Sequence, residues 1–194
     1  MSARAAAAGR KSLHLATGLL PVLWGIGVLE TEYVQLLLAA AASVAVGVEL
    51  LRRFSPGAGT LFSRFFGPML KPNETRSLTG ATWLALAMLA AALVFPPAVA
   101  RAALWAGAVG DASAALVGGA WGAWRGRSGK SLAGSLACLA TTAAGAIWLG
   151  GFAPLAAVAL GLVAALAEWP ARPGDDNVRV TLLVGAAAWV LVRG

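Results

Sequence analysis

Cysteine, histidine and charged residues are all scarce in this chain of 194 residues. Cys138 is the only cysteine, so these residues form no intrachain disulfide, and a single thiol builds no metal site. Charged side chains make up 12% of the chain, whereas a soluble domain of this length carries about twice that fraction. The sequence therefore excludes a disulfide-stabilised scaffold and argues against a soluble domain, and we expect Cys138 to serve in packing.

Apolar residues are abundant instead: they make up 59% of the chain, and the mean hydropathy is +0.78. They form seven stretches, at residues 13–29, 33–51, 79–95, 98–117, 134–149, 154–167 and 178–192. Crossing a bilayer takes about 20 residues, or somewhat fewer where a helix tilts or the bilayer thins. The pattern predicts one all-α integral membrane domain over 1–194, with about seven transmembrane helices and a short cytoplasmic tail at 1–10. Whether the short stretch at 154–167 crosses fully or re-enters stays open.

The basic residues concentrate on one side of this predicted bundle. Thirteen fall at the N-terminus or in every second loop: Arg4, Arg10, Lys11, Arg52, Arg53, Arg64, Lys71, Arg76, Arg125, Arg127, Lys130, Arg172 and Arg179. Only Arg101 and Arg193 fall on the other side. Because lysine and arginine concentrate in cytoplasmic loops, we expect a cytoplasmic N-terminus and an external C-terminus.

The net charge of +7 does not indicate a nucleic-acid partner, because the basic residues lie in short loops between predicted membrane helices. Such loops face the anionic headgroups of the lipid bilayer or a phosphorylated substrate. The richness in alanine, glycine and arginine favours a prokaryotic source, and hence a plasma membrane.

Most acidic residues share the predicted cytoplasmic side: Glu49, Glu74, Asp111, Glu168, Asp175 and Asp176. His14, the only histidine, begins the first apolar stretch on the same side. A proton relay or an ion channel would need polar groups through the full depth of the membrane. The opposite half is almost wholly apolar, so the pattern indicates chemistry at the inner interface.

Asp111 interrupts an apolar run, where a carboxylate costs about 2.5–3.5 kcal/mol at the centre of a membrane helix and is usually functional. We expect Gly118–Gly119 to end this helix, which would leave Asp111 about 10 Å from its inner end. Small residues share the helical face of Asp111: Gly107, Ala114, Ala115, Gly118 and Gly122. Such a face suits either a nucleotide or a closely packed helix, and both interpretations stay open.

The following loop, Trp124 to Ser135, combines glycines with Arg125, Arg127 and Lys130. Free amides at the start of the next helix, near Ser131, are typical of an anion site. The loop is not a Walker A motif, because residue 124 is tryptophan rather than glycine.

Structural roles are available for the other acidic residues. Glu49 and Arg52 are one helical turn apart and are able to form a local ion pair. Glu74 or Thr75 is placed to cap the third predicted helix, and Asp175 or Asp176 the last one.

Taken together, these segments resemble the family of CTP-dependent lipid kinases, which includes dolichol kinase, phytol kinase and fungal-type diacylglycerol kinase. The resemblance covers about residues 10 to 190 and lies in these pieces: Arg10–His14 with Gly18, Glu49–Arg52, Glu74 with Leu78–Thr82, Gly110–Asp111 with Ala114, Gly118 and Gly122, Lys130–Ser131 with Gly134–Ser135, and Asp176–Asn177. The stretch Val178-Arg179-Val180 departs from the more neutral segment expected there. The Lys/Arg, Asp and Pro-Gly-His-Gly-Gly signature of the neighbouring phosphatidate cytidylyltransferases is absent.

The resemblance implies transfer of the γ-phosphoryl group of CTP to the hydroxyl of a polyprenol, phytol or diacylglycerol-type lipid, with Mg²⁺. We expect Asp111 to be the principal metal ligand, supported by Glu74 or Asp176. Arg125, Arg127, Lys130 and the amides near Ser131 would hold the triphosphate. The remaining predicted nucleotide contacts are Gly110, Ser113, Gly118, Gly122, Gly134, Ser135 and Asn177.

Arg10 and Lys11 would neutralise developing charge, and His14 would be the general base, with Glu49 as a rival. A histidine that binds a backbone carbonyl at a helix start is an equal alternative for His14. Two other functions remain: a cytidylyltransferase that acts on a phosphorylated lipid, and a small seven-helix transporter of an anionic solute.

Overall fold

The computed structural model describes residues 3–70, 72–75, 77–126, 129–169 and 175–193. Its elements are α1 (Ala3–Thr17), α2 (Leu19–Gly25), α3 (Thr31–Phe54), α4 (Pro56–Phe66), η1 (Gly67–Met69), η2 (Pro72–Thr75), α5 (Gly80–Val94), α6 (Pro97–Trp105), η3 (Ala106–Gly110), α7 (Asp111–Trp121), α8 (Leu132–Gly150), α9 (Pro154–Glu168) and α10 (Asp176–Arg193). No strand occurs in these residues, where a single isolated β-bridge pairs Arg125 with Ser131. The all-α class is confirmed.

Helices occur over each of the seven apolar stretches, with ends that differ by a few residues, whereas α4, η1 and η2 lie between two of the stretches and were not predicted. The first stretch forms two consecutive helices, α1 and α2, with Gly18 between them. Helix α1 begins at Ala3, before the first apolar stretch, so most of the segment predicted as a cytoplasmic tail is helical. A run of alanines has high helix propensity, which explains this early start.

Within the described residues, three helical runs are long and apolar enough to cross a membrane by length and composition. They are α3, the consecutive run from Pro97 to Trp121, and α8. Two further apolar helices, α5 and α9, have 15 residues each, which corresponds to about 22 Å of helix.

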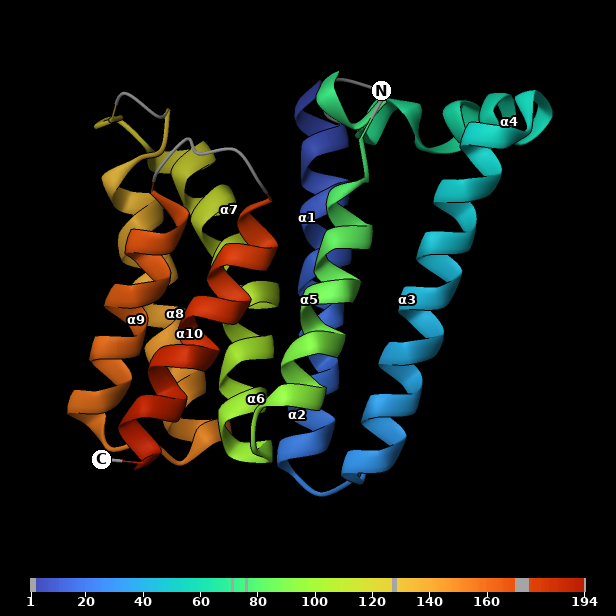
Figure 1. Cartoon of the computed structure of the whole chain (residues 1–194). Coiled ribbons are helices and arrows are strands. Elements are labelled where there is room, and N and C mark those ends of the chain that lie inside the picture. The colour runs from blue at the N-terminus through green and yellow to red at the C-terminus, as the bar shows by residue number, and fades with distance from the viewer. Residues whose placement is uncertain (1–2, 71, 76, 127–128, 170–174, 194) are drawn as a thin grey trace.

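The run from Pro97 to Trp121 lies at the centre of the bundle (Figure 1). Its residues take part in two hydrophobic clusters, one formed with α8, α9 and α10 and the other with α2, α3 and α5. Small residues bring the helices close: an added Cβ would lie 2.0 Å from the Trp105 ring at Gly145, and 2.5 Å from the Leu139 carbonyl oxygen at Gly161. Close backbone approach of this kind is typical of packed membrane helices.

The predicted helix break at Gly118–Gly119 is wrong, because α7 continues through both glycines to Trp121. Gly118 packs against the start of α8, where an added Cβ would lie 2.6 Å from Ser131 Oγ. Asp111 therefore lies about 15 Å along the axis from the end of α7, rather than about 10 Å. It is reached at this depth by α1, which packs against α7 and η3.

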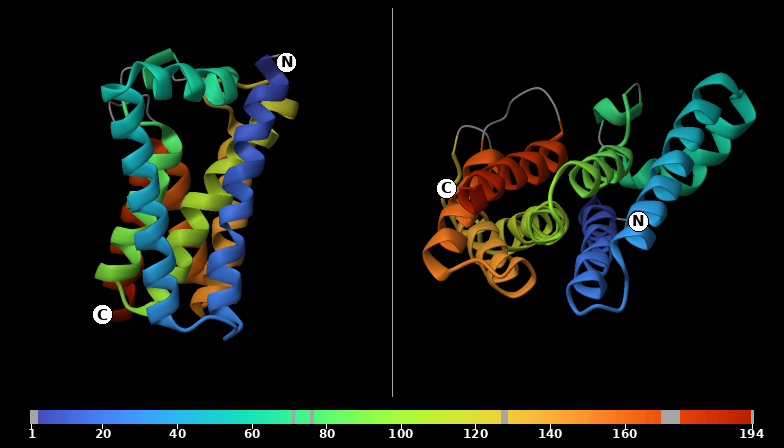
Figure 2. Two further views of the ribbon diagram at one scale, coloured as in Figure 1. Left: turned by 90° about the vertical axis from the view of Figure 1, so that its right-hand side faces the viewer. Right: turned by 60° about the horizontal axis from the view of Figure 1, so that its bottom comes forward.

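One end of the bundle carries the N-terminus, α4 and the starts of α5, α8 and α10, while the C-terminus lies at the other end (Figure 1). We term the former the basic end, because Arg10, Lys11, Arg52 and Lys130 belong to it. Helix α4 lies across this end rather than along the bundle (Figure 2). Its apolar side chains include the exposed Leu61, Phe65 and Phe66, a pattern typical of a helix at a membrane surface.

Candidate functional site

Asp111 lies at the start of α7 and is only 3% exposed. Lys11 of α1 donates a hydrogen bond to its Oδ2 atom and forms an ion pair with it. An unpaired buried charge is costly, so the partner explains how an apolar helix tolerates this carboxylate. Two predicted site residues from distant parts of the sequence therefore meet.

A π-helical turn, η3, immediately precedes Asp111. Such turns are rare and frequently occur at functional sites. Its glycines touch neighbouring helices: an added Cβ would lie 1.9 Å from Thr181 Oγ1 at Gly107, and 2.6 Å from Thr142 Oγ1 at Gly110. Helix packing thus accounts for Gly110, whose contact with a nucleotide stays a prediction.

His14 lies three residues after Lys11 on α1 and is buried. Its Nδ1 atom is 3.9 Å from Asp111 Oδ2. Residues three positions apart share a helical face, which brings both side chains of α1 to the same carboxylate. Arg10 points to another neighbour and donates to the carbonyl oxygen of Met69 at 3.5 Å.

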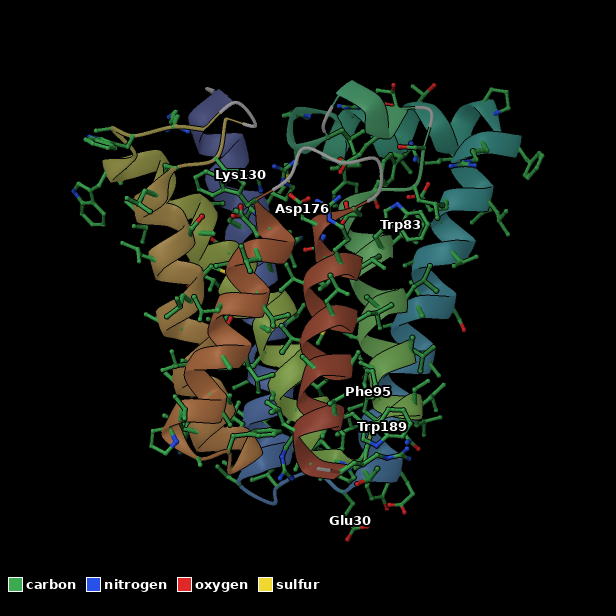
Figure 3. The ribbon with its side chains drawn as sticks, turned by 60° about the vertical axis from the view of Figure 1, so that its left-hand side comes forward. Glu30, Trp83, Phe95, Lys130, Asp176 and Trp189 are labelled. Carbon is green, nitrogen blue, oxygen red and sulfur yellow. The ribbon has the colours of Figure 1, made fainter. Side chains whose placement is uncertain are left out.

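Lys130 joins α9 to α10 at the basic end. Its Nζ atom donates to Glu168 and, at 2.9 Å, to Asp176 Oδ2. Figure 3 shows Lys130 beside Asp176, at the end opposite to Glu30. Burial alone would lower the pKa of Lys130, but the hydrogen bonds and charges of Glu168 and Asp176 outweigh it and raise this pKa above its ordinary value.

Glu168 is a site residue that sequence reasoning did not select. It ends α9 and is buried. An acidic residue at a helix C-terminus opposes the helix dipole, and a buried acid needs a partner. These two features of the sequence were signals that could have identified it.

Glu49 and Glu74 belong to a separate network between α3 and α5. Glu49 accepts hydrogen bonds from Arg52 Nε at 2.6 Å, from the Thr79 amide at 2.7 Å and from Thr82 Oγ1 at 3.1 Å. The Gly80 amide donates to Glu74 Oε1 at 3.0 Å, at the start of α5. The ion pair predicted for Glu49 and Arg52 is confirmed. The N-cap residue of α5 is Thr79 rather than Glu74 or Thr75, and Glu74 instead accepts from the first amide of this helix.

Several predicted nucleotide contacts have structural partners. Ser131 caps α8 by accepting from the Gly134 amide at 3.1 Å, and an added Cβ at Gly134 would lie 2.6 Å from the Ala114 carbonyl oxygen. Gly122 is also close to Ser131, at 2.9 Å between an added Cβ and Oγ. The packing interpretation of the small-residue face is therefore supported, and its contact with a nucleotide stays a prediction.

The remaining loop and helix residues differ in what they contact. Arg125 donates to the carbonyl oxygens of Gly118 and Gly129, at 2.8 and 2.9 Å. Ser113 donates to the Val109 carbonyl oxygen at 2.7 Å. Arg127 lies outside the described residues.

Ser135 and Asn177 are two other predicted nucleotide contacts, and each has a buried side-chain oxygen that could accept a hydrogen bond. Ser135 Oγ and Asn177 Oδ1 have no hydrogen-bond partner among the described residues. Asp175 accepts from the Asn177 amide at 2.9 Å and so caps α10, as one alternative predicted. Buried polar atoms without partners are uncommon and favour a ligand at this end of the bundle.

Two adjoining cavities lie between α1, α3 and α5. The cavity nearer the basic end, which we term the upper cavity, has a volume of about 260 Å³. It is lined by Arg10, His14, Glu49 and Glu74 together with threonines and apolar residues. The lower cavity, of about 380 Å³, is lined by apolar residues, His14 and Thr17, with no charged side chain. Three residues line both: Leu13, His14 and Ala81. We term the two neighbouring cavities together the α1/α3/α5 groove.

The described residues contain no cluster of three or more His, Cys, Asp or Glu side chains that could hold a metal ion. Asp111 pairs with Lys11, Asp176 with Lys130, and Glu74 with the start of α5. The structure thus does not gather the three predicted metal ligands into one shell. Mg²⁺ usually takes one or two carboxylates together with phosphates and waters, so Asp111 or Asp176 suits such an ion.

Comparison with known proteins gave no match: no family model, no curated protein and no solved structure is significantly similar to this chain.

Proposed function

We propose that this protein is a membrane-embedded lipid kinase that transfers the γ-phosphoryl group of CTP to the hydroxyl of a lipid alcohol. The observation that carries the proposal is the position of His14. This residue lines the α1/α3/α5 groove, and its Nδ1 atom lies 3.9 Å from Asp111 Oδ2. A general base must lie within hydrogen-bond reach of the acceptor hydroxyl without blocking its line of attack on the phosphorus. His14 lies where the apolar groove comes near the Asp111 carboxylate.

The charged groups at the basic end match what a metal–nucleotide complex requires. Phosphoryl transfer depends on positioning and on neutralising phosphate charge more than on covalent chemistry. Lys11 and Lys130 supply cations for phosphate oxygens, while Asp111 and Asp176 supply carboxylates for Mg²⁺. Without the nucleotide, these groups neutralise one another as ion pairs.

The proposed reaction forms a bond from the lipid oxygen to the γ-phosphorus and breaks the bond from that phosphorus to the bridging oxygen of CDP. His14 accepts the hydroxyl proton and later releases it to water, and CDP leaves. Mg²⁺, when bound, neutralises charge on the phosphates. Lys11 and Lys130 stabilise the charge that develops on the equatorial and leaving oxygens. CTP as donor, Mg²⁺ and the classes of lipid alcohol come from the sequence resemblance.

We place the basic end in the cytoplasm, with seven crossings formed by α1–α2, α3, α5, the run from Pro97 to Trp121, α8, α9 and α10. The excess of basic residues at this end supports the orientation. The two termini lie at opposite ends of the bundle (Figure 1), as an odd number of crossings requires. The 15-residue helices α5 and α9 would need local thinning of the bilayer.

The test is a transfer assay with the purified protein in lipid nanodiscs, Mg²⁺ and CTP labelled at the γ-phosphate, with a panel of lipid alcohols. We expect labelled lipid phosphate and CDP in equal amounts. Release of pyrophosphate would indicate cytidylyl transfer instead, and uptake of an unmodified anion into liposomes would indicate transport. Either result without lipid phosphate would overturn the proposal.

Asp111→Asn tests the same proposal within the chain. We expect at least a hundredfold loss of turnover, about the scale of losing one transition-state electrostatic group. The matched control is Glu32→Gln, since Glu32 is an exposed acid at the start of α3, at the opposite end. Full turnover in a folded Asp111→Asn protein would remove Asp111 from the mechanism.

A further inference from the structure

The α1/α3/α5 groove has a polar end and an apolar end. Near the basic end its lining includes Arg10, Glu49 and Glu74, and farther down no charged residue lines it. Along α3 the lining extends from Glu49 to Leu37, which corresponds to about 18 Å of helix. This length exceeds half of the hydrocarbon thickness of a bilayer, about 30 Å.

Helix α4 and η1 border the polar end. Phe62 and Phe66 of α4 line the upper cavity, together with Met69 and Leu70 at η1. Figure 2 shows α4 lying across the end of the bundle, above α3. A molecule in the groove would therefore contact α4 at the level of the polar residues, with its apolar part directed away from α4 between the helices.

The carboxylates at the polar end already have partners. Arg52 forms an ion pair with Glu49, and the amides of Thr79 and Gly80 donate hydrogen bonds to Glu49 and Glu74. The polar end thus presents hydrogen-bonding groups, which suit a hydroxyl. Arg10 lines the same cavity and adds a cation beside it, which complements the phosphate that the proposed reaction would place on that hydroxyl.

We infer that the α1/α3/α5 groove is the binding site of the acceptor alcohol, with the hydroxyl at His14 and a single apolar tail directed down the groove past Ala41 and Leu37. This inference rests on the proposed function for the identity of the hydroxyl as acceptor. Bulk lipid alone does not account for the site, because an ordinary lipid-facing surface carries no buried ionisable groups such as His14, Glu49 and Glu74. Along α3, Ala41 lies eight residues from Glu49, about 12 Å farther from the polar end.

A matched pair of substitutions separates groove contacts from general effects. Ala41 lines the lower cavity, whereas its neighbour Ala40 is also exposed but does not line either cavity. We expect Ala41→Trp to raise KM for hexadecanol at least tenfold and to leave KM for hexanol within twofold of the unchanged protein. Ala40→Trp should leave both within twofold. Equal effects of the two tryptophans on hexadecanol would overturn the groove assignment.

A binding measurement makes the inference independent of turnover. A long-chain alcohol with a photoreactive diazirine at its tail is crosslinked to the protein without CTP, and the adducts are located by peptide mass spectrometry. Adducts on groove residues of α3 and α5 that Ala41→Trp removes would support the groove, even if no phosphorylation occurred and the kinase proposal failed. Adducts spread over the outer helix faces, with intact phosphorylation, would overturn the groove and leave the kinase proposal standing.

Discussion

Lys11 and Asp111 form a buried ion pair that joins α1 to the start of α7 across 100 positions of sequence. The pair anchors the N-terminal helix to the central run of the bundle, beside His14. In the proposed reaction the two groups bind different partners: the Lys11 ammonium binds phosphate, and the Asp111 carboxylate binds Mg²⁺. The pair therefore has both a structural and a functional consequence.

Removing the cation alone should destabilise the protein. Lys11→Met leaves Asp111 as an uncompensated buried charge, and we expect a loss of about 3–5 kcal/mol in the free energy of unfolding. The double variant Lys11→Met with Asp111→Asn should recover most of that loss, because no charge is left buried. Denaturant unfolding in detergent measures both. The exposed Arg64→Met is the control, with a change within about 0.5 kcal/mol, and a Lys11→Met protein as stable as this control would contradict the pairing.

His14 and Glu49 should differ in the kind of loss that their substitution causes. We expect His14→Gln to lower kcat by about 10²–10⁴-fold with little change in KM for CTP, since a general base acts in the transition state. Glu49→Gln should instead reduce stability by about 1–3 kcal/mol, because it disrupts hydrogen bonds from Arg52, Thr79 and Thr82. Steady-state kinetics and thermal unfolding of both variants show which residue acts as the base. A loss of kcat in Glu49→Gln, with only a loss of stability in His14→Gln, would make Glu49 the better candidate.

Two glycines should respond in opposite ways to an added methyl group. Gly134→Ala brings a Cβ to within 2.6 Å of the Ala114 carbonyl oxygen, so we expect destabilisation by about 1–3 kcal/mol. Gly119→Ala meets nothing within 4 Å and should stabilise α7 by about 0.5–1 kcal/mol. Unfolding of the two variants, measured side by side, checks this. Equal stability would show that α7 and α8 do not approach so closely.

Lys130 should remain protonated in alkaline solution. Its pKa lies above the ordinary value of 10.5, so its stabilising charge is fully present below that value and is lost only as the pH rises through the higher pKa of the folded protein. At pH about 10, acetylation of Lys130 should be at least tenfold slower than in a free peptide of the same sequence, since each pKa unit reduces the neutral amine about tenfold. Glu168→Gln should speed it. Peptide mass spectrometry measures both rates, and peptide-like reactivity in the folded protein would rule out the buried pairing.

The positions of the helices could be read from the sequence, because apolar stretches separated by charged loops have few other stable solutions. The positions of Asp111 and Lys11 could be recognised as unusual, yet their pairing could not, since nothing local links residues so far apart. The helix break at Gly118–Gly119 was predicted from glycine propensity and is wrong, because packing of Gly118 against Ser131 overrides that propensity.

By itself, the sequence determined an all-helical, strongly apolar chain whose ionisable residues gather toward one end, because hydropathy and charge are local properties of each segment. Only the tertiary structure decided which charges neutralise one another: Lys11 with Asp111, and Lys130 with Glu168 and Asp176. It also decided that α1, α3 and α5 leave a groove beside His14. These outcomes depend on how helices from distant segments cross, and crossings are set by the combined fit of all the side chains between them.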